Sequence, residues 1–251
     1  MARNTAFFMH QRAVQIVQQQ RAAGPSAPPS PPFSFTDPTF NDGIVYAIID
    51  DGSGGKFVGG NFTSVTCNVT STTYTTGYER LVHLLPTGEV DAAWSCPANV
   101  NQVDALALDV ANDRLFVGGG FTTIGGESRD RLALVEASSG IVDTGWTCNT
   151  NGQVWALALD VANDRLFVGG SFTSIGGESR ADLALVDASS GTVNTGWVCD
   201  ATGGSVRSLL PDLANDALFV GGLFNGATGL DGQQRDRFGT VVASTGDLHV
   251  P

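Results

Sequence analysis

A glycine-rich motif recurs along the chain and constrains its fold more than any other feature. Well-preserved copies read NDRLFVGGGFT at residues 112–122 and NDRLFVGGSFT at residues 163–173, and shorter copies lie at residues 55–63 and 215–224. Counted from the first phenylalanine of each copy, the spacings are 59, 51 and 52 residues. A period near 50 residues indicates a repeat architecture, in which each unit buries its apolar surface by stacking on its neighbours.

Each repeat is predicted to form four short β-strands. In the second copy they are expected at residues 103–108, 114–121, 131–137 and 141–148. The first of them alternates larger apolar residues with smaller or polar ones, as a strand with one more deeply buried face does. Asn-Asp and Ser-Ser-Gly sequences supply the turns, and the paired glycines indicate a bulge or a close backbone approach. Four strands per unit at this period predict the blades of a β-propeller.

The predicted fourth strand ends at a tryptophan in three of the units. These residues are Trp94, Trp146 and Trp197, each three positions after an Asp or Asn. Because they recur at one position of the unit, we predict that they are buried between neighbouring blades. The same role is predicted for the recurring phenylalanines of the glycine motif, Phe116, Phe167 and Phe219.

The complete unit is similar to a known repeat. Phe-Val-Gly-Gly-x-Phe-Thr, then a Leu-x-x-Val/Leu strand and then Asp-x-x-Trp/Phe, resembles the delta-60 family of β-propeller repeats. The double glycine resembles kelch repeats more loosely. The resemblance covers residues 34–251 and implies a β-propeller, but a propeller fold does not imply one function. The chain departs from the family in its small number of repeats and in an insertion at residues 67–78 of the first.

The two ends of the repeat region are predicted to complete each other. The last unit stops at Pro251 before any aromatic residue, whereas Asp37-Pro38-Thr39-Phe40 aligns with Asp143 to Trp146. We therefore expect Asp37 and Phe40 to lie in a strand, residues 34–40, that closes the ring and removes its open edge. The alternative is that this strand enters a blade of a neighbouring chain.

The predicted fold is all-β, a propeller of four four-stranded blades that follows an N-terminal arm. The propeller domain is residues 34–251 and the arm is residues 1–33. The blades are expected at residues 43–97, 103–148, 154–199 and 206–251, the last completed by residues 34–40.

The arm differs in composition from the repeats. Residues 6–22 lack Gly and Pro and favour one amphipathic helix, and the prolines of residues 25–32 favour a stiff spacer. The arm holds three arginines and no acid, whereas the whole chain has a net charge of −12. The composition fits a disordered tail or a docking helix on a spacer. In the second case the docking residues are Phe7, Phe8, Met9, Arg12, Ile16, Val17 and Arg21.

The residues that could carry chemistry have structural explanations. Cys96, Cys148 and Cys199 share one repeat position and are predicted to be buried thiols, and Cys67 is close enough in sequence to reach Cys96. His10, His83 and His249 are isolated in sequence, and no catalytic, metal or cofactor site is predicted.

Two recurring charged patterns also have structural explanations. The acidic turns at residues 109–113 and 160–164 are interpreted as hairpin turns rather than calcium sites. Recurring arginines are expected to form ion pairs at blade corners with nearby Glu127 and Glu178; they are Arg129, Arg180 and Arg235.

Charge and hydropathy exclude several classes of function. A net charge of −12 with a single lysine argues against a nucleic-acid partner. The sequence has no apolar run long enough to span a membrane and no pattern of a secretory signal near its start. The repeats offer no converging polar groups, so an enzyme is not expected.

Two functions are compatible with these observations. The first is a structural or display protein, a propeller held by its arm on copies of itself or on a capsid or tail scaffold. A phage or virus particle, in which it would serve as a decoration, fibre or tail-associated protein, explains the absence of a signal. The alternative is an extracellular or cell-surface adhesion module that recognises glycans or peptides.

Overall fold

The computed structural model describes residues 36–68, 70–224 and 230–248. Within these ranges the chain is all-β, with nineteen strands and two short 3-10 turns, η1 (Val161–Asn163) and η2 (Leu213–Asn215). In this part of the chain, no helix is long and apolar enough to cross a membrane. The arm, residues 1–33, lies outside the described residues, and so do its predicted helix and spacer.

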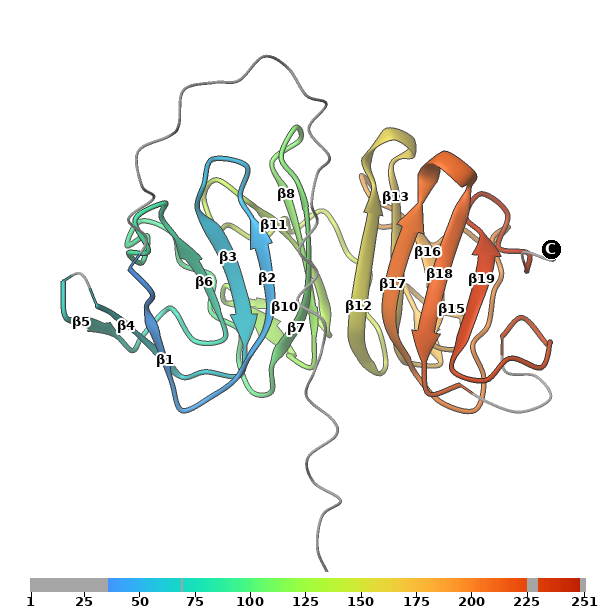
Figure 1. Ribbon diagram of the computed structural model, residues 1–251, viewed down its shortest axis with the longest axis horizontal. Helices are drawn as coiled ribbons and strands as arrows, with labels where there is room; N and C mark the ends of the chain where they lie inside the picture. The colour runs from blue at the N-terminus through green and yellow to red at the C-terminus, as the bar shows by residue number, and fades with distance from the viewer. Residues whose placement is uncertain (1–35, 69, 225–229, 249–251) are drawn as a thin grey trace, which may run out of the picture.

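Each repeat forms one three-stranded antiparallel sheet, which we call a blade (Figure 1). Blade 1 contains β2 (Val45–Asp50), β3 (Lys56–Gly60) and β6 (Leu81–Leu84). Blade 2 contains β7 (Val103–Asp109), β8 (Arg114–Gly119) and β11 (Leu132–Glu136). Blade 3 contains β12 (Gln153–Asp160), β13 (Arg165–Ser171) and β16 (Leu183–Asp187). Blade 4 contains β17 (Val206–Asp212), β18 (Ala217–Gly222) and β19 (Phe238–Val242).

The predicted fourth strand is reduced to a single β-bridge in each blade. The bridges join Leu84 to Val90, Val135 to Val142, Val186 to Val193 and Val241 to Leu248. The reason is a local turn that follows the bridge. Oδ1 of Asp143 accepts hydrogen bonds from the backbone N–H groups of Gly145 at 2.8 Å and Trp146 at 3.2 Å. This side chain takes the donors that a ladder would use and turns the chain out of the sheet.

Small two-stranded hairpins carry the connection from one blade to the next. They are β9 (Thr123–Ile124) with β10 (Glu127–Ser128), and β14 (Ser174–Ile175) with β15 (Glu178–Ser179). The segment that follows each tryptophan pairs with the hairpin of the next blade, through Ala98 with Ile124 and Thr150 with Ile175. In the first repeat the insertion lengthens this hairpin into β4 (Ser64–Cys67) and β5 (Thr72–Tyr74).

The predicted ring closure is wrong in the described residues. β1 (Thr39–Asn41) pairs with β4, with Phe40 opposite Val65, so it belongs to the first repeat. Figure 1 shows β1 at one end of the molecule and β17, β18 and β19 at the other. Consecutive blades pack through their first strands, β2 on β7, β7 on β12 and β12 on β17, whereas β2 and β17 make no such contact in the described chain.

The physical reason is a register difference of four residues. Phe40 pairs with the hairpin of blade 1 at the position where Ala98 and Thr150 pair with the hairpins of blades 2 and 3. Ala98 and Thr150 each lie four residues after a tryptophan, so the residue that corresponds to the tryptophans is Thr36 and not Phe40. In agreement, Gly88 packs against the backbone of Thr36. Phe40 instead packs on Phe62 at a ring distance of 4.8 Å. The described part of residues 34–40, including Asp37, therefore lies in the first repeat and does not complete blade 4.

Close approach of valine to glycine joins each blade to the next. A Cβ added to Gly59, Gly118 or Gly169 would lie 2.5, 2.6 or 2.5 Å from a valine Cγ1 of the following blade. These valines are Val103, Val154 and Val206, and all three are fully buried. The first glycine of each motif is therefore required because no side chain fits.

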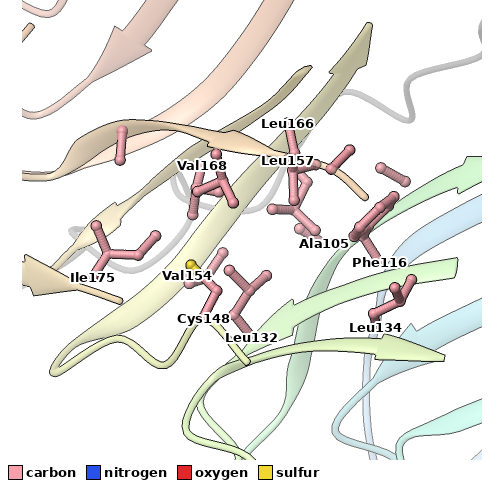
Figure 2. Packing of buried hydrophobic residues seen from close by; sticks show 14 of the residues in the cluster. Ala105, Phe116, Leu132, Leu134, Cys148, Val154, Leu157, Leu166, Val168 and Ile175 are labelled. Carbon is pink, nitrogen blue, oxygen red and sulfur yellow. The ribbon is translucent and has the colours of Figure 1, made fainter. Parts of the chain in front are cut away.

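A separate apolar cluster fills each of these junctions. Figure 2 shows the cluster between blades 2 and 3, where Val154 and Leu157 lie close to Leu132 and Phe116. Two further clusters repeat this arrangement between blades 1 and 2 and between blades 3 and 4. Each blade is therefore stabilised mainly by the blades beside it, as in other repeat proteins.

Filling one of these glycine positions should destabilise the protein. In Gly169→Ala, the new Cβ would overlap Val206 Cγ1 and approach Leu209 Cδ1 at 3.3 Å. Overpacking of this kind costs about 1–3 kcal/mol, which denaturant unfolding can measure. Gly196→Ala is the control, because its nearest atom is Asn194 Oδ1 at 3.5 Å. Equal stability of the two variants would contradict this packing, and Val206→Ala combined with Gly169→Ala should cost less than the sum of the two changes.

Candidate functional site

The recurring tryptophans lie inside the junctions between blades. Trp94, Trp146 and Trp197 are each 1% exposed. Each indole Nε1–H donates to a backbone carbonyl of the next blade, at 2.9, 3.1 and 3.2 Å; the acceptors are Ala137, Ala188 and Ala243. A buried indole needs such a partner, so these residues hold blades together and offer no stacking surface for a ligand.

The phenylalanines of the motif fall into two groups. Phe116 and Phe167 are fully buried, and their rings lie 5.8 Å from Trp146 and Trp197. Phe219 in blade 4 is only partly buried and stacks on Phe238 at 6.2 Å. Phe238 is 59% exposed. Blade 4 therefore presents an aromatic pair on its outer face, where the earlier blades are covered.

Buried aspartates fix the turn between the first and second strands of a blade. Asp109 is 1% exposed and accepts hydrogen bonds from Asn112 Nδ2 at 2.8 Å and from Arg114 Nη2 at 2.6 Å. Burial alone would raise the pKa of Asp109, but the hydrogen bonds from Asn112 and Arg114 outweigh it and hold the pKa below its ordinary value. Asp160 repeats this arrangement with Asn163 and Arg165. Both acidic turns are therefore internally neutralised hairpin turns.

His83 has the same structural role in blade 1. Its Nδ1 lies 2.9 Å from Asp91 Oδ2 and its Nε2 lies 3.1 Å from Asp51 Oδ2, and the ring stacks on Phe57 at 4.5 Å. Asp51 directly follows the first strand of blade 1, one position after Asp50, which pairs with Lys56 as Asp109 pairs with Arg114. Both ring nitrogens are thus engaged within the protein. His10 and His249 lie outside the described residues.

The expected ion pairs of Arg129 and Arg180 are not formed in the described chain. Arg129 is 7% exposed, and its guanidinium donates to the carbonyl oxygens of Ser128 at 2.7 Å and Asp143 at 3.1 Å. Arg180 repeats this with Ser179 and Asn194. The prediction was wrong because these side chains turn inward to satisfy backbone carbonyls, whereas Glu127 and Glu178 are exposed. Arg235 donates to the carbonyl of Gln234.

All four cysteines are free and buried. Burial raises the pKa of the Cys96 and Cys148 thiols to about 12, so both are protonated at neutral pH. The prediction of buried thiols that pack as small apolar groups is confirmed.

A groove of about 590 Å³ lies between blades 2 and 3. Its charged lining residues are Asp113, Arg114, Glu136, Asp143 and Asp164. These groups are already held by neighbours. Asp113 accepts from Ser138 at 2.6 and 2.7 Å, and Arg114 Nη1 donates to Asp164 at 2.9 Å across the junction between the two blades. The groove is a polar, acidic surface without converging reactive groups.

No group of three or more metal-ligating side chains occurs in residues 36–68, 70–224 and 230–248. The predicted docking residues of the arm, Phe7, Phe8, Met9, Arg12, Ile16, Val17 and Arg21, lie outside these ranges.

Comparison with known proteins gives similarity to solved structures only. No protein-family model matches the chain, and no curated protein matches it significantly. A structure of U3-55K aligns with 12% identity and a TM-score of 0.46 over 75% of this chain and 49% of that one. The RRP9 WD40 repeats align with 12% identity and a TM-score of 0.45 over 74% and 48%.

A chain in a mitotic checkpoint complex structure aligns with 16% identity and a TM-score of 0.46, over 82% of this chain and 74% of that chain. The chain spans about half the length of the first two structures that it matches. The description of the sheets as propeller blades rests on their strand order and packing.

The burial of the junction tryptophans leaves one indole for a quencher to reach. Trp155 is only partly buried and lies under the guanidinium of Arg207 at 3.9 Å. Acrylamide should therefore quench a single component of the native fluorescence, and Trp155→Phe should remove it. A quenchable component of unchanged size in Trp155→Phe would place another tryptophan at the surface.

Asp182 should make the protein less stable as pH rises. It occupies the position of Arg80 and Arg131, and burial raises its pKa to about 7. The folded state then binds the proton more tightly than the unfolded state, so stability falls between about pH 4 and pH 7. Asp182→Asn should melt with the parent near pH 4 and above it at pH 8. Asp42→Asn is the control for removing an aspartate from a backbone position with positive φ. A constant difference for Asp182→Asn across this range would contradict the assignment.

Proposed function

We propose that this protein is a non-enzymatic structural or display protein, in which a stack of β-propeller blades is attached to a larger assembly by the N-terminal arm. The observation that carries the proposal is how the polar side chains are used. Those that line the groove and the turns are paired with neighbours inside or between blades, as in Asp109 with Arg114 and Arg114 with Asp164. Such pairing stiffens a framework and leaves no group prepared for proton transfer or nucleophilic attack.

The charge distribution supports attachment through the arm. The arm carries Arg3, Arg12 and Arg21 without an acid, whereas the chain as a whole is strongly acidic. A short amphipathic helix is marginal in water and gains stability on a partner surface. The partner is then a second copy of the arm or an acidic scaffold, and the assembly that we favour is a phage or virus particle. In that setting four blades would project as a decoration, fibre or tail-associated element.

The groove between blades 2 and 3 favours a second candidate function. The groove is open and is lined by acidic side chains together with apolar ones, which suits an adhesion module for glycans or peptides at a cell surface. Its acidic lining would select a cationic or hydroxyl-rich ligand.

Deletion of residues 1–24 separates the two candidates. The shortened and complete chains, each with the same C-terminal tag, are produced alongside the particles of the source, and incorporation is measured after sedimentation. We expect the deletion to abolish incorporation and leave the melting temperature unchanged. The control replaces Arg3, Arg12 and Arg21 with lysine, which keeps the charge. Normal incorporation of the shortened chain would overturn attachment through the arm.

A further inference from the structure

The contact between consecutive blades is the same at all three junctions. The valine that begins the first strand of one blade sits on the first motif glycine of the blade before it. At the junctions of blades 2 with 3 and 3 with 4, a leucine three residues later completes the contact. Leu157 Cδ1 and Leu209 Cδ1 lie 3.4 and 3.3 Å from the Cβ positions of Gly118 and Gly169. These leucines are 8% and 3% exposed. Each blade thus has one face that inserts residues and one face that receives them.

The inserting face of blade 1 is uncovered along β2. Register places Val45 and Ile48 where Val154 and Leu157 stand in blade 3, with the same bulge opposite the glycine pair. Val45 is only partly buried, and Ile48 is 48% exposed. The neighbouring Ile44 is 47% exposed. Val45 packs on the apolar cluster of its own blade, but in the described chain no other blade packs on this face of β2.

The receiving face of blade 4 is uncovered in the same way. The three atoms nearest to a Cβ added to Gly221 all belong to its own blade: Ser208 Oγ at 2.5 Å, and Arg237 O and Ser208 Cβ, each at 3.9 Å. Phe238 pairs with Gly221 as Leu132 pairs with Gly118, yet Leu132 is fully buried and Phe238 is 59% exposed. Leu210, in the same blade, is 55% exposed.

The connecting segment that crosses each junction is already present on blade 1. At the other junctions, the segment after a tryptophan pairs with the hairpin of the next blade, as Ala98 does with Ile124. At blade 1 this place is filled by β1, through Phe40 and Val65. Blade 1 therefore has the outer part of a junction and lacks only the receiving sheet, which is what blade 4 presents.

We propose that blade 4 of one molecule receives blade 1 of a second copy, with Val45 on Gly221 and Ile48 beside Phe238, as a fourth instance of the internal junction. The occupant is a second copy because the two faces are the two halves of a contact that this chain makes three times. The two faces differ, so the interface is head-to-tail. Repeated association forms a closed ring if the rotation between successive molecules returns to the start, and a filament if it does not.

Complementary variants test this arrangement directly. Ile48→Asp removes the inserting face and Phe238→Asp the receiving face, and both positions are exposed within one molecule. Sedimentation velocity at several concentrations should show association of the parent chain and single molecules for each variant alone. An equimolar mixture should associate again into dimers, because Phe238 of the first variant and Ile48 of the second are intact.

Control variants distinguish association through blades 1 and 4 from association through the arm or another surface. Ile141→Asp, at another exposed apolar residue, should associate as the parent does. Loss of association on deleting residues 1–24, with no effect of Ile48→Asp, would assign association to the arm and overturn the proposal. A parent that is monomeric at all concentrations, or a mixture of variants that stays monomeric, would also overturn it. If an aspartate variant fails to melt like the parent, Ile48→Ser and Phe238→Ser replace the pair.

Discussion

The contact of a valine with a glycine of the preceding blade is the constraint on which the rest of the structure depends. Because a Cβ at Gly59, Gly118 or Gly169 would lie within about 2.6 Å of the valine, the two sheets approach as closely as backbone and side chain allow. A bulge lies opposite each of these glycine pairs. The leucines and tryptophans of neighbouring blades then pack into one apolar cluster at each junction. Stability is then largely a sum over junctions, and a blade at an end has half of its junctions unused.

Polar groups in this protein determine where the chain turns and where side chains point, which the apolar core does not specify. The Asp143 turn ends the sheet and sends Trp146 across the junction, where its indole finds the carbonyl of Ala188. The buried Asp109 fixes a tight turn through Asn112 and Arg114, and Arg114 extends the network to the next blade. Buried polar groups with all these partners rigidify a framework. A rigid framework of this kind supports the proposed role in display or assembly.

The sequence was sufficient for the units, the order of their first three strands and the buried thiols, because the repeat period and the glycine pair constrain them strongly; the predicted fourth strand is only a single bridge. It misplaced residues 34–40, since Asp37 to Phe40 matches Asp143 to Trp146 in letters while pairing places Phe40 at the position of Ala98. It also assigned Arg129 to an ion pair, because sequence proximity to Glu127 does not reveal which way a buried guanidinium turns. The end faces could not be predicted at all. The exposure of an end face depends on whether another blade packs on it. Because the repeats are similar in sequence, the sequence does not distinguish a terminal blade from an internal one.

The most direct test of whether the stability of each blade depends on its junctions is amide hydrogen exchange. It is measured for each strand at a low and at a high protein concentration. In dilute solution, amides of β7 and β12, which have blades on both sides, should exchange more slowly than those of β2 and β18. At high concentration only the end strands should gain protection. Equal protection of all four blades at low concentration, or slowest exchange in β2 and β18, would contradict the account.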